Sequence, residues 1–115
     1  MNKPISMTCY ASKKGYVLAL CDTNRLGKVY SEHTNDDLVC LDLKLYSRFY
    51  NSDDSILVDQ KDVIDFIRRN KIHTINAVGE KSVSALVTLG IVSEDEIIYI
   101  SDVPHAQVFY IRKKD

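Results

Sequence analysis

The 115-residue sequence contains few glycines and prolines, four and two respectively. Flexible linkers and low-complexity tracts are rich in these residues, so their scarcity favours one compact unit, and no internal repeat is apparent. The three cysteines, Cys9, Cys21 and Cys40, form no C-x-x-C pair, which argues against a zinc ribbon or a thioredoxin-like redox site. Each cysteine lies in an apolar run, where we expect a reduced thiol buried in the core.

The sequence also lacks long apolar runs and an excess of either charge. Its longest apolar run, residues 16–21, is too short to cross a bilayer, and the N-terminus has no apolar segment of the kind found in signal peptides. Acidic and basic residues nearly balance, 16 against 15, so the strongly basic character of many nucleic-acid-binding proteins is missing at the level of the whole chain. We therefore expect a cytoplasmic location, no membrane partner and no signal specific for DNA.

The composition that is present is typical of a globular protein, with 45% apolar and 27% charged residues. A chain of this length buries roughly two-thirds of the surface that its unfolded form exposes. That is enough for a hydrophobic core without disulfides or a structural metal. The sequence predicts a single domain over residues 1–115.

The first half of the sequence has the patterns of β-strands. Residues 6–11 alternate between apolar and polar, and residues 16–21 are continuously apolar, as in a central strand. The polar tetrad 12–15, which ends in glycine, suits a hairpin loop between them. Two further strands are predicted over residues 26–31 and 38–45, with a polar turn between them.

The second half changes to a helical period. A helix is predicted over residues 60–69, because its apolar residues share one face and Asp59 can cap its first turn. After a short strand over residues 74–78, a second helix begins at Gly79 and ends before Gly90.

The last part of the chain returns to strands. Ser93 and Glu96 match a capping box around a single helical turn. Strands are predicted over residues 97–100 and 106–111, with a turn over 101–104 between them. The whole order predicts an α+β or mixed α/β fold, with a single mixed sheet of about five to seven strands and two helices on one face.

Several segments resemble one family of archaeal proteins, and together they span nearly the whole chain. They are the Val-Pro-His-Ala-Gln-Val-Phe stretch at 103–109, the Asn-Ala-Val-Gly-Glu-Lys-Ser-Val stretch at 76–83, Cys21-Asp22 with Leu-Gly-Lys at 26–28, Phe49-Tyr50 and residues 89–92. On these residues the sequence is similar to the family known as domain of unknown function 424. The resemblance implies a small protein without an established activity.

The sequence departs from that family at two positions where family members often have glycine. Here the residues are Asn51, after the Phe-Tyr pair, and Asp102, before Val-Pro-His. Asn and Asp tolerate left-handed backbone geometry better than other non-glycine residues, so we expect the turns to be retained.

The first candidate site is the start of the second helix. Gly79, Glu80, Lys81 and Ser82 follow a strand that carries Asn76, and free N–H groups at a helix N-terminus can bind an anion. The pattern matches neither a P-loop nor a dinucleotide-binding fingerprint. The alternative is an ordinary strand-to-helix turn with Glu80 as a first-turn anion.

The second candidate site is His105 with Gln107, which share one face of a strand. A histidine can serve as acid, base or ligand near neutral pH, and Pro104 restricts how the imidazole is presented. No nucleophile is recognisable beside it, and the spacing of His33 and His73 suggests no metal site, so no metal or cofactor is expected. The alternative is that His105 and Gln107 only hold a turn together by hydrogen bonds.

The third candidate is a nucleic-acid-binding surface of basic residues and tyrosines. The basic residues are Lys13, Lys14, Arg25, Lys28, Arg68, Arg69 and Lys71, with Arg112, Lys113 and Lys114 in the tail. The tyrosines are Tyr10, Tyr16, Tyr30, Tyr46, Tyr50, Tyr99 and Tyr110. The alternative is a solvated charged surface with half-buried tyrosines, since nearby acidic residues weaken the long-range field.

These patterns favour a non-enzymatic binding module with a partner such as RNA or a ribonucleoprotein. The alternative is a small-molecule or anion site, which would include any enzymatic activity, built from His105, Gln107 and the helix start at Gly79. That alternative requires the two motifs to be neighbours in space.

Overall fold

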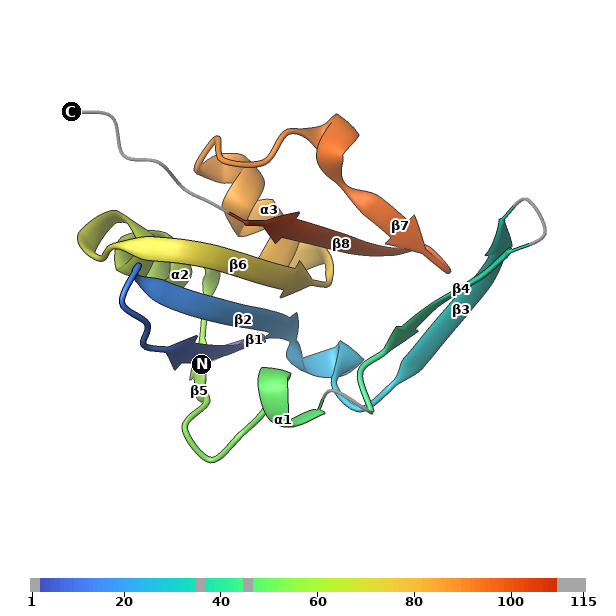
Figure 1. Cartoon of the computed structure of the whole chain (residues 1–115), viewed down its shortest axis with the longest axis horizontal. Coiled ribbons are helices and arrows are strands. Elements are labelled where there is room, and N and C mark those ends of the chain that lie inside the picture. The colour runs from blue at the N-terminus through green and yellow to red at the C-terminus, as the bar shows by residue number, and fades with distance from the viewer. Residues whose placement is uncertain (1–2, 35–36, 45–46, 110–115) are drawn as a thin grey trace.

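The computed structural model describes residues 3–34, 37–44 and 47–109 of the chain. Its main element is a six-stranded sheet with the strand order β5-β1-β2-β6-β8-β7 (Figure 1). The strands are β1 (Ile5–Tyr10), β2 (Tyr16–Asp22), β5 (Ile56–Val58), β6 (Ile72–Val78), β7 (Ile98–Ile100) and β8 (Val103–Val108). The predicted α+β class is therefore confirmed, with a mixed main sheet.

The mixed character comes from one junction at the centre of the sheet. Strand β2 pairs in parallel with β6, whereas the other neighbouring strands of the main sheet pair antiparallel. Strands β2 and β6 are far apart in sequence, and their register places Ala19 opposite Asn76 and Cys21 opposite Val78. This junction brings the end of the first half of the chain beside the beginning of the second helix.

Two helices cover one face of the main sheet (Figure 1), as predicted. They are α2 (Gln60–Arg69) and α3 (Glu80–Thr88), and they pack on each other and on the sheet. Asp59 caps α2 in a capping box with Asp62, and Gly90 after α3 has a φ of 78°, the left-handed geometry expected of a C′ glycine. The core between these layers is formed by strand residues such as Leu18, Leu20 and Ile75.

The opposite face of the sheet is covered in part by a helical turn and by a hairpin. The turn is α1 (Ser47–Tyr50), and the hairpin joins β3 (Val29–Thr34) to β4 (Asp37–Asp42). A second, smaller core forms here, in which Tyr50 and Leu43 pack against Cys21 and Val78. In Figure 1 the far end of the hairpin projects away from the main sheet.

The hairpin differs from the predicted single sheet, because β3 and β4 form a separate two-stranded sheet. After β2 the chain turns through the 3-10 helix η1 (Thr23–Arg25) and through Gly27, whose φ is +75°. The strand expected over 26–31 therefore begins at Val29, and the strand expected over 38–45 ends at Asp42. Strand β5 and helix α1 were not predicted, since elements of three and four residues are too short to show a period.

The last strand also begins earlier than predicted, at Val103 instead of residue 106. Ser101 and Asp102 form the preceding turn with φ values of 49° and 65°, so Asp102 does adopt the left-handed geometry expected where relatives have glycine. The capping box of Ser93 and Glu96 is present around the 3-10 helix η2 (Glu94–Glu96). Within the described residues, no helix has the length and apolar character needed to cross a membrane.

Candidate functional site

The start of helix α3 is occupied by a carboxylate from the chain itself. Asp22, the last residue of β2, is buried and accepts hydrogen bonds from the Lys81 N–H at 2.9 Å and from the Ser82 N–H at 2.8 Å. The Ser82 hydroxyl donates a third bond to Asp22 Oδ1 at 2.8 Å. The free N–H groups that would attract an external anion are thus already paired with an internal one.

Gly79 makes this arrangement possible. Its φ of +104° lies in a region that side chains rarely adopt, and a Cβ at this position would stand 2.3 Å from Cγ of Asp22. The N–H of Gly79 donates to the Pro104 carbonyl at 2.9 Å. Gly79 is therefore a close junction between β2, β8 and the start of α3.

The two motifs proposed from the sequence are neighbours along the backbone but face different sides of the sheet. Val78 and His105 are register partners in the pairing of β6 with β8. Ala106 packs in the core under the helices, and side chains alternate along a strand, so His105 and Gln107 point to the face that carries α1 and the hairpin. The His105 side chain and the α3 N-terminus are separated by the sheet.

His105 and Gln107 line a hollow together with Asn76. This hollow, which we call the His105 hollow, has a volume of about 250 Å³. Its remaining lining is formed by residues 40–43 of β4 and the turn after it, and by Phe49 and Tyr50 of α1. Three candidate residues from the sequence thus meet in one place, and Glu80, Lys81 and Ser82 do not join them.

The polar floor of the His105 hollow contains an amide pair and an imidazole. Gln107 Nε2 donates to Asn76 Oδ1 at 2.8 Å, as the direct opposition of these residues in the sheet allows. The Nε2 atom of His105 is buried and has no hydrogen-bond partner among the described residues. Burial lowers the pKa of His105, so its imidazole is held in the neutral form at neutral pH.

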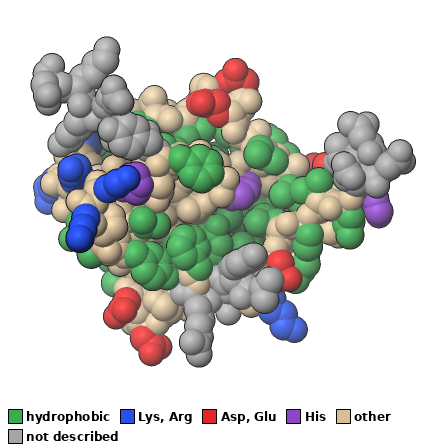
Figure 2. Space-filling model, viewed as in Figure 1, with side chains coloured by type: hydrophobic (Ala, Val, Ile, Leu, Met, Phe, Trp, Pro, Cys, Tyr) green, Lys and Arg blue, Asp and Glu red, His purple; other side chains and the backbone are tan. Residues whose placement is uncertain are grey.

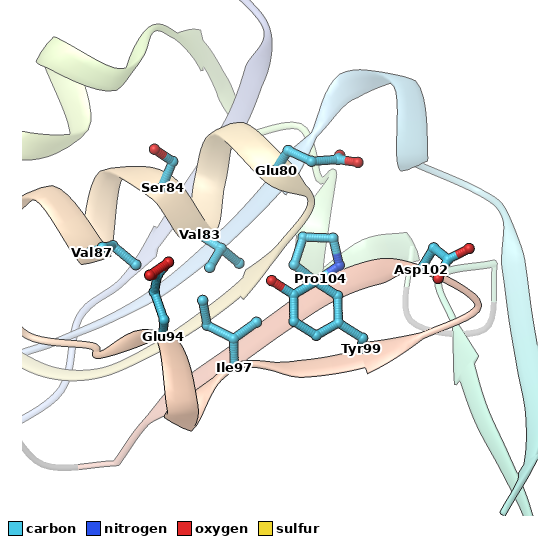
Figure 3. A pocket seen from close by; sticks show the side chains of 9 residues that line it. All are labelled: Glu80, Val83, Ser84, Val87, Glu94, Ile97, Tyr99, Asp102 and Pro104. Carbon is cyan, nitrogen blue, oxygen red and sulfur yellow. The ribbon is translucent and has the colours of Figure 1, made fainter.

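A second hollow lies on the helix side, between α3 and β7 (Figure 3). Val83, Ile97 and Pro104 form apolar parts of its wall, while Glu80, Glu94 and Asp102 bring carboxylates to it. It is also about 250 Å³ in volume. Among the described residues, no group of three or more His, Cys, Asp or Glu side chains has the arrangement of a metal site.

Five of the predicted basic residues converge at one end of the main sheet. Lys13 and Lys14 lie in the turn between β1 and β2, Arg68 and Arg69 end α2, and Lys71 precedes β6. The Tyr16 N–H donates to the Lys71 carbonyl at 2.9 Å, which holds the hairpin turn beside the end of α2. We call these five residues the basic end, and Figure 2 shows Lys and Arg side chains gathered at the left of this face.

Arg25 and Lys28 lie elsewhere, close to the base of the β3–β4 hairpin. Arg25 donates to Glu80 at 2.9 Å and lies over the ring of Tyr30, so its charge is balanced within the chain. Among the described residues, the salt bridges are this pair and Lys3 with Asp62, and neither involves the basic end. Arg112, Lys113 and Lys114 lie outside the described residues.

Most of the described tyrosines are engaged inside the protein and do not offer open stacking faces. Tyr10 stacks on Phe49 with the rings 5.4 Å apart, and Tyr16 packs against Phe66. Tyr50 is buried, and burial raises the pKa of its hydroxyl. Tyr99 on β7 is exposed, and Tyr46 and Tyr110 lie outside the described residues.

The expectation of three buried thiols is wrong for one of them. Cys21 is buried and Cys9 is half-buried, but Cys40 is exposed, because it lies on the projecting hairpin. The apolar run around Cys40 packs on the main sheet only at its end, where Leu41 and Leu43 join the smaller core. Cys40 also lines the His105 hollow.

Sequence reasoning missed the role of Asp22 and the contribution of β4 and α1 to the His105 hollow. The available signal for Asp22 is its position directly after the continuously apolar run 16–21, because a carboxylate at the end of a central strand needs hydrogen-bond donors if it is buried. No comparable signal marked residues 40–43, since their contact with β6 and β8 depends on how the hairpin leaves the main sheet.

The fold and these sites define a small α+β protein with a mixed sheet, helices on one face and a polar hollow on the other. The family model described as "Protein of unknown function (DUF424)" matches residues 10–111, and the chain belongs to this family. The resemblance seen in the sequence is thereby confirmed. The search of curated proteins gave no match.

A solved structure has a similar fold. It is described as the "Crystal structure of an uncharacterized conserved protein from Methanopyrus kandleri". The two chains are 26% identical, the alignment covers 96% of each, and the TM-score is 0.67.

Proposed function

We propose that this protein is a non-enzymatic module that binds single-stranded RNA through its basic end. The carrying observation is the hydrogen bond of 2.9 Å from the Tyr16 N–H to the Lys71 carbonyl, which joins the Lys13–Lys14 turn to the end of α2. Five cations from two segments of the chain, residues 13–14 and 68–71, are gathered there. Phosphate contacts by Lys and Arg supply most of the affinity of proteins that bind nucleic acids without sequence preference.

The net charge of −1 does not contradict this proposal, because binding depends on local charge. Four of the 16 acidic residues lie on other elements, Glu94–Glu96 in η2 and Glu80 in α3, where Glu80 is paired with Arg25. Asp65, one turn before Arg68 and Arg69 on α2, is the acidic residue closest in sequence to the cluster. The positive charge of the basic end is therefore available to the phosphates of a single-stranded RNA.

The test is binding of a short, unstructured, fluorescently labelled RNA between about 50 and 200 mM salt. We expect affinity to fall with salt, with a slope of about 0.7 for each phosphate neutralised on a single strand. The variant Lys13→Gln/Lys14→Gln removes two of the cations, so the slope should decrease by roughly 1 to 1.5 and affinity should fall for every sequence.

A matched control removes the same charge from another place. Lys3→Gln/Lys61→Gln changes two exposed lysines at the N-terminal end of α2, opposite to the end that carries Arg68 and Arg69, and should bind RNA like the unmodified protein. Equal losses in the two double variants would show that net charge alone is responsible. Absence of binding at 50 mM salt would refute the RNA proposal itself.

The second candidate function is a small-molecule site, and one observation favours part of it. The Gly79 N–H is bonded to the Pro104 carbonyl, so the two motifs are adjacent as that hypothesis requires. However, Asp22 takes the donors at the start of α3, and the sheet separates them from His105. The part of the molecule that could still form a small-molecule site is the His105 hollow with the amide pair of Gln107 and Asn76.

A further inference from the structure

We infer that the His105 hollow accepts one unpaired nucleobase, with a preference for adenine. This inference rests on the proposed function, because the base belongs to the bound RNA. Recognition of the base is argued from the residues that line the hollow. The volume of about 250 Å³ is below the roughly 300–1,000 Å³ of sites for drug-sized ligands, so it suits a single planar ring system.

The amide pair supplies the recognition. Once Gln107 Nε2 has bonded to Asn76 Oδ1, the pair still has a free oxygen on Gln107 and free N–H groups on Asn76. If the oxygen and nitrogen positions of both amides are exchanged, the pair still has one free hydrogen-bond acceptor beside one free donor group. Adjacent donors and acceptors are what the edge of a base presents, and Asn or Gln is the common partner of adenine.

His105 adds a third polar group to the same floor. Its Nε2 atom is buried and without a partner among the described residues, which is costly unless a ligand group can pair with it. Because the imidazole is neutral, it can donate or accept a hydrogen bond without adding charge. His105 is thus suited to hydrogen-bond with the polar edge of a neutral ring, and it has no charge with which to bind a phosphate group.

The charges and the apolar wall of the hollow favour binding of a nucleobase over binding of a phosphate group. No Lys or Arg is among the described lining residues, and Asp42 contributes a carboxylate, which repels an anion. Leu41, Leu43 and Phe49 provide apolar and aromatic wall. Specific recognition of RNA commonly places an unstacked base in such a surrounding, with its edge hydrogen-bonded.

The His105 hollow is close enough to the basic end for one single-stranded RNA to contact both. Lys71 directly precedes β6, and Asn76 lies five residues further along that strand, so the two are separated by roughly 16 Å at the usual rise of a strand. Thr74 lies between them on the same face as Asn76. A single strand can span this interval in a few nucleotides, with phosphates at Lys71 and one base in the hollow.

The first experiment compares oligo(A), oligo(U) and oligo(C) of equal length at fixed salt. We expect oligo(A) to bind about tenfold more tightly, and Gln107→Ala to remove the preference without changing the salt slope. Asn24→Ala, at an exposed turn, is the matched control and should keep the preference. Equal affinity for the three oligomers would overturn the inference and leave the RNA proposal standing.

A second variant makes the test more specific. Gln107→Glu leaves only acceptors at this position, and Glu accepts from the amino group of cytosine. We expect overall affinity to decrease because of the new charge, while the preference shifts from oligo(A) to oligo(C). Unchanged preference in Gln107→Glu would show that Gln107 does not contact a base.

The third experiment needs no RNA. Cys40 lines the hollow and is exposed, so its reaction with a thiol reagent reports occupancy. Millimolar adenosine should slow this reaction severalfold, and adenosine should not protect Cys40 in Gln107→Ala. If RNA does not bind but adenosine protects Cys40, the proposed function fails and the nucleobase site stands; if adenosine gives no protection and no base preference exists, the site is refuted.

Discussion

Asp22 Oδ1 receives hydrogen bonds of 2.8 Å from both the N–H and the hydroxyl of Ser82, although the two residues are 60 positions apart. The carboxylate stands at the end of β2 and acts as the cap of α3, a helix whose own preceding residue is glycine and has no side chain for this purpose. This link fixes α3 against the central parallel pair of the sheet. It also pairs the N–H groups of Lys81 and Ser82 at the start of the helix with a carboxylate of the chain itself.

We predict that Asp22→Ala destabilises the protein by about 2–3 kcal/mol, since it removes the cap and leaves buried donors on Ser82 unpaired. Asp22→Asn retains one acceptor oxygen and should cost less. Chemical denaturation measured by circular dichroism gives both values. Asp53→Ala, at an exposed loop, should change stability by less than about 0.5 kcal/mol, and a similar loss there would contradict this account.

The second prediction concerns Gly79→Ala, which should destabilise more than Gly27→Ala. Both positions have positive φ, but the Cβ at Gly79 would meet Asp22 at 2.3 Å, whereas at Gly27 nothing lies within 4 Å. For alanine a left-handed backbone such as that of Gly27 costs roughly 1–2 kcal/mol. Gly79, at φ 104° and ψ 160°, lies in a region that is essentially restricted to glycine, and a Cβ there adds the clash. Thermal unfolding of the two variants compares them directly.

The clash can be separated from the strain by combining substitutions. In an Asp22→Gly background the whole side chain is gone, including the Cβ that would stand 2.6 Å from a Cβ at position 79, so Gly79→Ala should cost less than it does in the unmodified chain. Strict additivity of the two substitutions would mean that Gly79 is needed for its backbone conformation alone.

The third prediction is a pH dependence caused by His105. Burial lowers its pKa in the folded state below the ordinary value of 6.5, so the unfolded chain binds a proton more readily. The free energy of unfolding should therefore decrease as pH falls through 6.5, and the loss should be complete below the folded-state pKa. His105→Gln removes this contribution, and its stability should change less between pH 7 and 5 than that of the unmodified protein.

The fourth prediction uses the three cysteines. Cys40 is exposed and should react quickly with a thiol reagent in the native protein at pH 8. Cys21 should not react until the protein unfolds, because burial, with a further contribution from the nearby Asp22 charge, raises its pKa to about 12. Cys9 is half-buried, and burial raises its pKa too, so an intermediate rate is expected. Mass spectrometry of labelled peptides identifies each site.

Parts of the candidate site could be predicted from the sequence because they depend on local pattern. Alternation along a strand puts His105 and Gln107 on one face, and the tetrad with Lys13 and Lys14 suits a hairpin turn. The partners of these residues could not be predicted in the same way. Asn76 meets Gln107 through a pairing of β6 with β8 that no local feature specifies, and Lys71 meets the turn through the parallel pairing of β2 with β6.

The sequence by itself determined the α+β class, the capped helix after Asp59, the helix between Gly79 and Gly90, and the family resemblance. These depend on periodicity, caps and motif residues that act over a few positions. Only the tertiary structure decided that the β3–β4 hairpin leaves the main sheet, that Asp22 fills the start of α3, and that the basic residues separate into two places. Strand pairing and long-range packing set these features, because the residues that meet are distant in sequence and contact each other only once the sheet has formed.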